Sequence, residues 1–296
     1  MDNVIYETRQ SEKSKGLESK GLHSPICTGN SSGPVCALAE PLENHVQLMW
    51  PLSFASPQLG ENDVHVWAFY LDVSPASLQR FESFLSLDER ERASRFHFEQ
   101  HRNRYVAGRG WLRELLGAYV DVSPDKIKFD YGLYGKPAFS QQSARKDIDF
   151  NLAHSDSFAV AGVTHTGPLG LDLERVRPLE DMGELVKRFF SQRESSLFEQ
   201  LKREKQLSGF FNLWTRKEAW LKATGQGISH YLNQVEVSFL PEQSARLLKL
   251  PEGFPPAHEW SLHDLNPGCG LKGALAIAAK EARISCWQWC DVSNPA

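Results

Sequence analysis

The two halves of this 296-residue chain repeat one order of segments, and this repeat restricts the fold more than any other feature. Each half has a helical segment, an Arg-Phe pair, a long helix that carries tryptophan, a short strand and then a pair of strands. The Arg-Phe pairs are Arg95-Phe96 and Arg188-Phe189. A repeated unit of this kind predicts an α+β fold of two similar lobes related by pseudo-twofold symmetry, with the active site in the cleft between them.

Hydrophobic periodicity places the elements of both halves. In the first half it predicts helices at Ser86–Phe98 and His101–Tyr119, and strands at His65–Leu71, Ile127–Asp130, Asp147–Ala153 and Phe158–Thr164. His154–Ser157 is expected to be the tight link of a hairpin between the last two strands. In the second half the pattern predicts helices at Leu179–Phe190, Ser191–Leu201 and Phe210–Gly225, and strands at Gly167–Leu173, Val235–Leu240, Ala257–His263, Leu271–Ala279 and Ser285–Val292.

Composition sets the domain limits and excludes several classes of protein. Residues 1–45 are rich in Ser, Gly, Lys, Glu and Pro, which predicts a disordered or loosely attached extension before lobes at 46–166 and 167–296. The net charge is −4, so no basic balance calls for nucleic acid or an anionic membrane. No apolar run approaches the roughly 20 residues of a membrane span, and no secretory signal opens the chain. We therefore expect a cytoplasmic protein with neither nucleic acid nor a membrane as partner.

The five cysteines are scattered through the chain, which argues against a disulfide framework. No group of His and Cys has the spacing of a zinc site.

The segment Phe210–Gly225 predicts a helix that sets a carboxylate and an ammonium among aromatic side chains. Glu218 and Lys222 are four residues apart, so both project over one short patch. Taken alone, such a pair is usually a surface ion pair that contributes only about 0.2–0.5 kcal/mol. The alternative is a metal ligand followed by a lysine that binds phosphate.

The segment Gly170–Glu174 predicts a strand whose alternation puts Asp172 and Glu174 on one face. A half-exposed strand with polar residues outward would show the same pattern. If Glu218 joins the pair, three hard oxygen ligands without Cys or His favour Mg²⁺, or Mn²⁺, over Zn²⁺. Mg²⁺ commonly takes phosphate oxygens to complete its shell, so this metal implies a phosphate substrate near Lys222.

Arg102, Arg104, Arg109 and Arg113 lie along the helix predicted at 101–119, with Glu114 as its only acid. This density predicts a local positive patch, although a solvated helix face would look the same.

Four motifs of the sequence together resemble those of the 4′-phosphopantetheinyl transferase family. The resemblance rests on Gly170-Leu171-Asp172-Leu173-Glu174 followed by Trp214-x-x-Lys217-Glu218-Ala219-x-x-Lys222, and on two preceding motifs, Tyr134-Gly135-Lys136-Pro137 and Phe150-Asn151-Leu152-Ala153-His154-Ser155. It covers roughly residues 64–280, and two lobes on one chain resemble the monomeric Sfp type rather than the short trimeric type.

The resemblance implies an enzyme that transfers 4′-phosphopantetheine from coenzyme A to a serine of an apo acyl or peptidyl carrier protein. Asp172, Glu174 and Glu218 would hold Mg²⁺ at the diphosphate, and Lys222 would contact that diphosphate. Glu218, or a water that it holds, would accept the serine proton. The adenosine and 3′-phosphate of coenzyme A would be bound by the remaining motif residues, which are Arg92, Arg113, Lys136, Pro137 and His154.

Ala153 departs from the family pattern, which more often has serine before the histidine, so a side-chain hydrogen bond from this position is lost. Outside its motif, His154 would be as well explained by a surface histidine. Two other functions remain open: another Mg²⁺-dependent enzyme acting on a phosphate ester, and a module that binds carriers or coenzyme A without turnover. The carrier is also open among those of fatty-acid, polyketide, nonribosomal-peptide and aminoadipate-reductase enzymes.

We expect the carrier to dock on a local apolar and basic surface around Phe190–Lys205, because the net charge offers no global attraction. The alternative is that Phe190, Leu197, Phe198 and Leu201 belong to the core.

Overall fold

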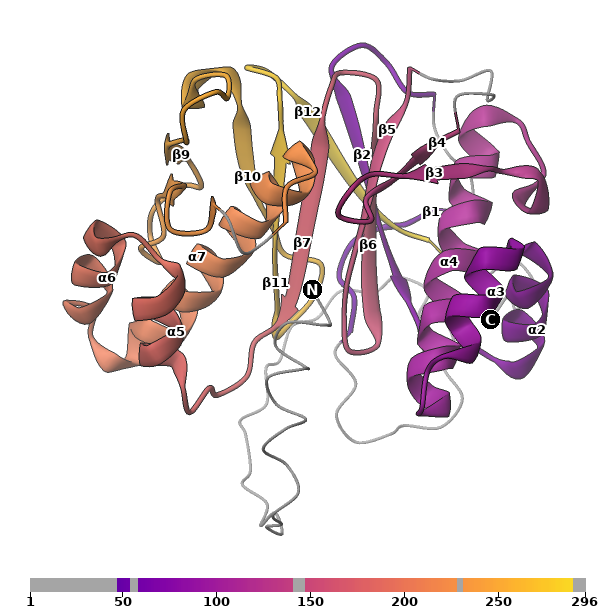
Figure 1. Ribbon diagram of the computed structural model, residues 1–296, viewed down its shortest axis with the longest axis horizontal. Coiled ribbons are helices and arrows are strands. Elements are labelled where there is room, and N and C mark those ends of the chain that lie inside the picture. The colour runs from indigo at the N-terminus through magenta and orange to yellow at the C-terminus, as the bar shows by residue number, and fades with distance from the viewer. Residues whose placement is uncertain (1–46, 54–57, 141–146, 228–230, 290–296) are drawn as a thin grey trace, which may run out of the picture. The chain divides into compact units, whose positions relative to one another are not determined.

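Two sheets of unequal size organise the fold, which a computed structural model describes for residues 47–53, 58–140, 147–227 and 231–289 (Figure 1). The predicted extension at 1–45 and Cys27, Cys36 and Cys290 therefore lie outside the described residues. The first sheet has the strand order β1 (Leu52–Ser53), β12 (Arg283–Trp289), β2 (Asp63–Tyr70), β6 (Phe158–Thr164), β5 (Asp149–Ser155). The second has the order β10 (Ser261–Leu265), β11 (Leu271–Ile277), β7 (Leu169–Arg175).

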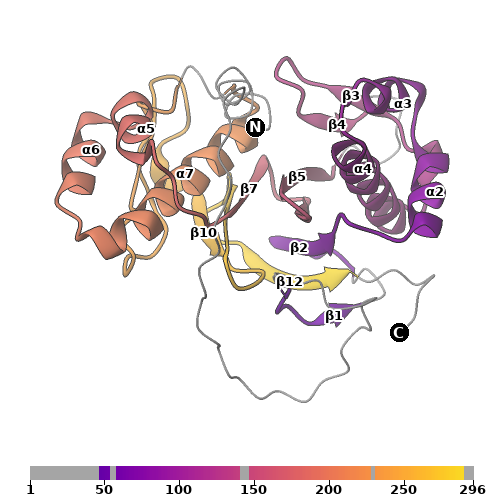
Figure 2. The same ribbon diagram turned by 90° about the horizontal axis from the view of Figure 1, so that it is seen from below.

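Each sheet is accompanied by three helices that lie between its first strand and its hairpin along the chain (Figure 2). The first set is α2 (Pro75–Phe84), α3 (Leu87–Ser94) and α4 (Glu99–Val120). The second set is α5 (Met182–Phe189), α6 (Gln192–Glu199) and α7 (Arg203–Thr224). Short pieces complete the fold: η1 (Pro124–Lys126), β3 (Phe129–Tyr131), β4 (Pro137–Phe139), β8 (Glu236–Val237), β9 (Leu247–Lys249) and η2 (Ala257–Glu259). None of the described helices combines the length and the apolarity that crossing a membrane requires.

The alternation of side chains along the strands gives the first sheet two apolar faces. On one face Trp67, Phe69 and Phe150 pack against Phe81 and Trp111 of helices α2 and α4. The other face packs against the second sheet, with residues of both in one core: Val66, Val160, Leu171, Leu173 and Leu275. The first sheet is therefore covered on both sides, and the second sheet has its other face left for α7.

The predicted duplication is confirmed in the way each lobe fixes its long helix. Glu89 and Glu194 each complete a capping box at the start of α3 and α6. Arg113 and Lys217 both stand fourteen residues after the first residue of α4 and α7. Arg113 donates to Glu89 at 2.8 Å, and Lys217 donates to Glu194 at 2.5 Å. The same buried link, built from equivalent positions, supports two lobes with one plan.

Several elements differ from the sequence prediction. Helix α3 ends at Ser94, not at Phe98, and Arg95 caps it. His154 lies within β5, so the hairpin link is Asp156-Ser157, where Asp156 takes the left-handed backbone (φ 51°) that a tight turn needs. The strand predicted at Val235–Leu240 shortens to Glu236–Val237, and Ala257–His263 divides into η2 and β10. The prediction missed α2, although Ser74 caps it and Pro75 opens it, as is typical of a helix start.

Strand β12 lies near the end of the described chain, yet it does not belong to the sheet of the second lobe. It pairs in parallel with β2, with Trp287 opposite Trp67, and so belongs to the first sheet. The boundary predicted at residue 167 would instead assign it to the second lobe.

Candidate active site

Helix α7 lies directly on β7 because Gly170 has no side chain. A Cβ atom on Gly170 would stand 2.1 Å from both the Ala219 carbonyl oxygen and the Ala223 nitrogen, closer than real Cβ contacts allow. Ala219 is fully buried in this contact. The strand motif around Gly170 and the helix motif around Ala219 are therefore in contact. This contact brings Glu218 and Lys222 close to Asp172.

The Lys222 ammonium donates to Asp172 Oδ1 at 2.7 Å. Asp172 and Glu218 are each only 1% exposed. Their other oxygens, Asp172 Oδ2 and Glu218 Oε1, are buried without a hydrogen-bond partner. Since a buried carboxylate oxygen without a partner is costly, these two atoms indicate a place for a further cation.

The charges of this cluster act strongly on one another. Burial, together with the negative charge of Asp172, raises the pKa of Glu218 to about 8. Burial also raises the pKa of Asp172, although Lys222 opposes this. Burial would lower the pKa of Lys222, but Asp172 and Glu218 outweigh it and raise that pKa. The ammonium therefore stays charged while Glu218 titrates near neutral pH.

Glu174 is placed differently from the other two predicted metal ligands. Its Oε2 accepts a hydrogen bond from Ser155 Oγ at 3.2 Å. In the part of the chain that the structure describes, no group of three or more His, Cys, Asp or Glu side chains is close enough to hold a metal ion. The structure thus brings together Asp172, Glu218 and Lys222, and Glu174 lies two residues further along β7, bonded to Ser155.

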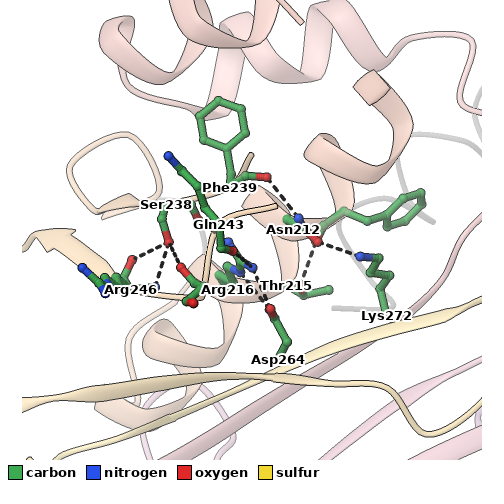
Figure 3. Close-up of polar contacts among 11 residues, drawn as sticks. Asn212, Thr215, Arg216, Ser238, Phe239, Gln243, Arg246, Asp264 and Lys272 are labelled. Atoms are coloured by element: carbon green, nitrogen blue, oxygen red, sulfur yellow. Dashed lines mark hydrogen bonds and ion pairs between the residues drawn. The ribbon is translucent and has the colours of Figure 1, made fainter. Parts of the chain in front are cut away.

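The rotation of α7 about its axis is fixed on the side away from β7. Arg216, which sequence reasoning missed, is 1% exposed and binds Asp264 of β10 through Nε at 2.9 Å and Nη2 at 2.7 Å (Figure 3). It also donates to the Ser238 carbonyl oxygen at 2.6 Å. A buried arginine in a helix interior leaves no local mark in the sequence, because its charge suggests a surface position.

Lys136 bridges elements of both lobes. Its Nζ donates to Asp149 Oδ2 at 3.0 Å and to the Leu169 carbonyl oxygen at 2.8 Å, and the Ala223 carbonyl oxygen lies at 3.5 Å. An ammonium group has three hydrogens, and the protein here provides an acceptor for each. The predicted contact of this side chain with coenzyme A is thus not prepared in the structure. Pro137 opens β4 opposite Tyr131.

The prediction of a positive patch on α4 is wrong, because each of the four arginines of this helix has a carboxylate partner. Arg102 pairs with Glu82 and Arg104 with Asp72. Arg109 and Arg113 share Glu89, and Arg113 also donates to the Ile127 carbonyl oxygen at 2.8 Å. Arg113 is 1% exposed and already bound to Glu89, so the structure gives no support to its predicted contact with coenzyme A.

Arg92 and His154 are the predicted coenzyme-binding residues that lie at the surface. Both are exposed, Arg92 on α3 and His154 on β5. The Arg92 guanidinium lies over the Tyr105 ring, 5.5 Å from its centroid.

Two of the four apolar residues of the predicted carrier surface, Phe190 and Phe198, are buried. Phe190 and Phe198 are each 4% exposed, whereas Leu197 is 37% exposed. Phe190 and Phe210 also pack their rings together, at 5.8 Å between centroids. Phe190 and Phe198 therefore belong to the core, which was the alternative to the prediction of carrier docking.

Comparisons with known proteins show the family to which the chain belongs. Residues 168–280 match the family described as "4'-phosphopantetheinyl transferase superfamily", and residues 72–165 match "4'-phosphopantetheinyl transferase, N-terminal". The 4'-phosphopantetheinyl transferase HetI of Nostoc sp. is 40% identical over 228 residues, which cover 77% of this chain and 93% of that protein. Sfp of Bacillus subtilis is 28% identical over 69% of this chain and 88% of its own.

A solved structure with a weaker likeness is the Helicobacter pylori holo-[acyl-carrier-protein] synthase in complex with coenzyme A. It is 18% identical, with a TM-score of 0.29, over 38% of this chain and 99% of that chain.

Proposed function

Because this chain belongs to the 4′-phosphopantetheinyl transferase superfamily, we propose that it transfers the 4′-phosphopantetheine arm of coenzyme A to a serine hydroxyl of an apo carrier protein. The observation that carries the proposal is the buried cluster of Asp172, Glu218 and Lys222, which unites both sequence motifs. It is the one place described above where buried carboxylate oxygens of two elements stand unpartnered beside a lysine.

In the proposed reaction the serine oxygen attacks the phosphorus that bears the pantetheine arm. The bond from that phosphorus to the bridging diphosphate oxygen breaks, and adenosine 3′,5′-bisphosphate leaves with the bond's electron pair. Glu218, or a water bound to it, accepts the serine proton. Lys222 offsets negative charge that develops on the leaving oxygen.

The residues present fit a divalent cation of the hard class. Asp172 Oδ2 and Glu218 Oε1 are unpartnered oxygens, the donor type that Mg²⁺ and Mn²⁺ prefer. Glu174, two residues along β7, would join them as the third carboxylate. Bound there, Mg²⁺ would neutralise charge on the diphosphate. Since both lobes are on one chain, we propose that a monomer is the active form.

The direct test measures holo carrier and adenosine 3′,5′-bisphosphate from coenzyme A and Mg²⁺, with a panel of apo carriers of the fatty-acid, polyketide, nonribosomal-peptide and aminoadipate-reductase kinds. Product should require a carrier. Release of bisphosphate without one would instead favour another phosphate-ester enzyme, and binding without turnover would favour the non-catalytic module.

The site is tested by Asp172→Asn and Glu218→Gln, which keep side-chain size and remove the charge. Each should lower kcat by roughly 10²–10³-fold, since it removes a group that acts on the developing charge. Lys126→Gln, a change at an exposed lysine of η1 that pairs with Asp125, is the control and should transfer at the wild-type rate. Wild-type kcat in either site variant would contradict the assignment.

A further inference from the structure

Strands β5 and β7 lie side by side at the junction of the two sheets, yet they are not paired as strands. Each is the last strand of its own sheet. Figure 2 shows them adjacent between the two sets of helices. An unpaired strand edge that is buried leaves backbone N–H groups without acceptors, which is costly. The edge of β7 therefore needs acceptors from elsewhere.

Side chains of β5 provide these acceptors at a constant spacing. The Leu169 N–H donates to Asp149 Oδ2 at 2.7 Å, and the Leu171 N–H donates to Asn151 Oδ1 at 2.8 Å. The Arg175 N–H donates to Ser155 Oγ at 3.0 Å. Each pair is separated by 20 residues. Alternate residues of a strand point to one side, so Asp149, Asn151 and Ser155 form one row, here called the inter-lobe ladder.

Position 153 belongs to the same row, but Ala153 has no acceptor to offer. Its counterpart at the same spacing is Leu173, the residue between Asp172 and Glu174. The ladder thus skips this position, which lies next to the two candidate metal ligands of β7.

Both ends of the ladder are tied to other groups of the candidate site. At one end Ser155 Oγ, which accepts from Arg175, donates its own proton to Glu174 Oε2 at 3.2 Å. At the other end Lys136 donates to Asp149 Oδ2 and to the Leu169 carbonyl oxygen. The Ser155 hydroxyl therefore holds both the backbone of β7 and the Glu174 carboxylate on that strand.

We propose that Asp149, Asn151 and Ser155 are positioning residues: through the inter-lobe ladder they hold β7, and with it Asp172 and Glu174, in the geometry that binds the divalent cation. The proposal rests on the proposed function. According to this proposal, side chains of the first lobe align the metal ligands of the second lobe.

The test compares Ser155→Ala with Ser155→Thr, which keeps the hydroxyl. Calorimetry measures the Kd of Mg²⁺ in the presence of coenzyme A, and the transfer assay measures the Mg²⁺ concentration for half-maximal rate. Ser155→Ala should raise both by about tenfold or more, the usual effect of removing an outer hydrogen bond to a metal ligand. Ser155→Thr should stay within about twofold of wild type. Asn151→Leu, which removes the next acceptor at similar size, should act in the same direction.

Ser238→Ala is the matched control. Ser238 Oγ also accepts one backbone N–H, from Arg246 at 2.8 Å, and donates one bond, to the Ser244 carbonyl oxygen at 2.7 Å. It should lower Tm about as much as Ser155→Ala and leave the Mg²⁺ affinity unchanged.

An equal loss of Tm in Ser155→Ala and Ser238→Ala, with Mg²⁺ affinity at the wild-type value in both, would make the ladder structural only and overturn the proposal. A wild-type protein that neither binds Mg²⁺ nor transfers would overturn the proposed function itself, and the ladder's role with it. The two failures are therefore distinguishable.

Position 153 gives a second test. Ala153→Ser should add a hydroxyl to the row opposite Leu173, raise Tm and lower the Kd of Mg²⁺. A lower Tm with weaker Mg²⁺ binding would show that position 153 is not part of the row.

Discussion

Glu218 is a carboxyl group whose surroundings oppose its ionisation. Burial and the charge of Asp172 raise its pKa to about 8 from an ordinary value of 4.5. Between these values the folded protein holds a proton that the unfolded chain has released. The free energy of unfolding of the metal-free protein should therefore fall as the pH rises from about 4.5 to about 8.

Glu218→Gln removes this penalty, so in EDTA its Tm should exceed that of wild type at about pH 8.5, and the difference should shrink toward about pH 5. Thermal unfolding across this pH range measures it. Glu114→Gln is the control, because Glu114 holds the matching position of α4 and bonds Arg80 at 2.6 Å. It should give no gain at high pH. A Tm difference that is the same at every pH would contradict the raised pKa of Glu218.

Arg92 and Arg113 separate a binding role from a structural one. Arg92 is exposed, and Arg92→Ala should raise KM for coenzyme A about tenfold but not KM for 3′-dephospho-coenzyme A, as the loss of a charged hydrogen bond to one phosphate would do. Arg113→Ala should instead lower Tm sharply, because it removes one of two partners of the buried Glu89. Its effect on KM should be equal for both coenzymes. A selective KM change in Arg113→Ala would restore its predicted contact with the 3′-phosphate.

At the scale of elements, the distance between α7 and β7 is set by one residue. Gly170→Ala would place a methyl group against the Ala219 carbonyl oxygen and the Ala223 backbone, neither of which is a flexible side-chain end. The helix must shift, and Glu218 and Lys222 move with it relative to Asp172. We expect kcat to fall by roughly 10²-fold, since a displacement of about 1 Å has such an effect, together with a lower Tm.

Gly183→Ala is the control for that change. Gly183 lies in α5, and a Cβ atom there meets nothing within 4 Å. It should stabilise the helix by about 0.5–1 kcal/mol and leave kcat unchanged. Activity assays and thermal unfolding of the two variants compare a glycine needed for close approach with one that is not; full activity in Gly170→Ala would show that α7 tolerates the shift.

At the scale of the whole molecule, the sequence predicted the features that depend on local residue patterns. The two-lobe α+β plan and the meeting of Glu218, Lys222 and Asp172 follow from periodicity and from the resemblance of the two motifs. Burial of Arg113 and Arg216 did not follow, because their carboxylate partners, Glu89 and Asp264, lie far away in the chain. The inter-lobe ladder also needs the register of β5 against β7, which no local pattern contains.

Strand β12 is the largest long-range feature that the sequence did not place, and it joins the end of the described chain to the first lobe. It lies between β1 and β2, and Trp287 stacks on Trp67 with 4.9 Å between ring centroids. Without it, one edge of β2 and the side of the Trp67 ring that Trp287 covers would be exposed.

Truncation after Ala282 should therefore destabilise the first sheet, although the cut lies at the far end of the chain from β2. Hydrogen exchange should show lost protection at Asp63–Tyr70, with β11 at Leu271–Ile277 less affected, because β11 pairs only with β7 and β10. A chain that ends at Trp289 retains β12 and is the control. Equal protection of β2 in the two truncated chains would mean that the first sheet holds without its C-terminal strand.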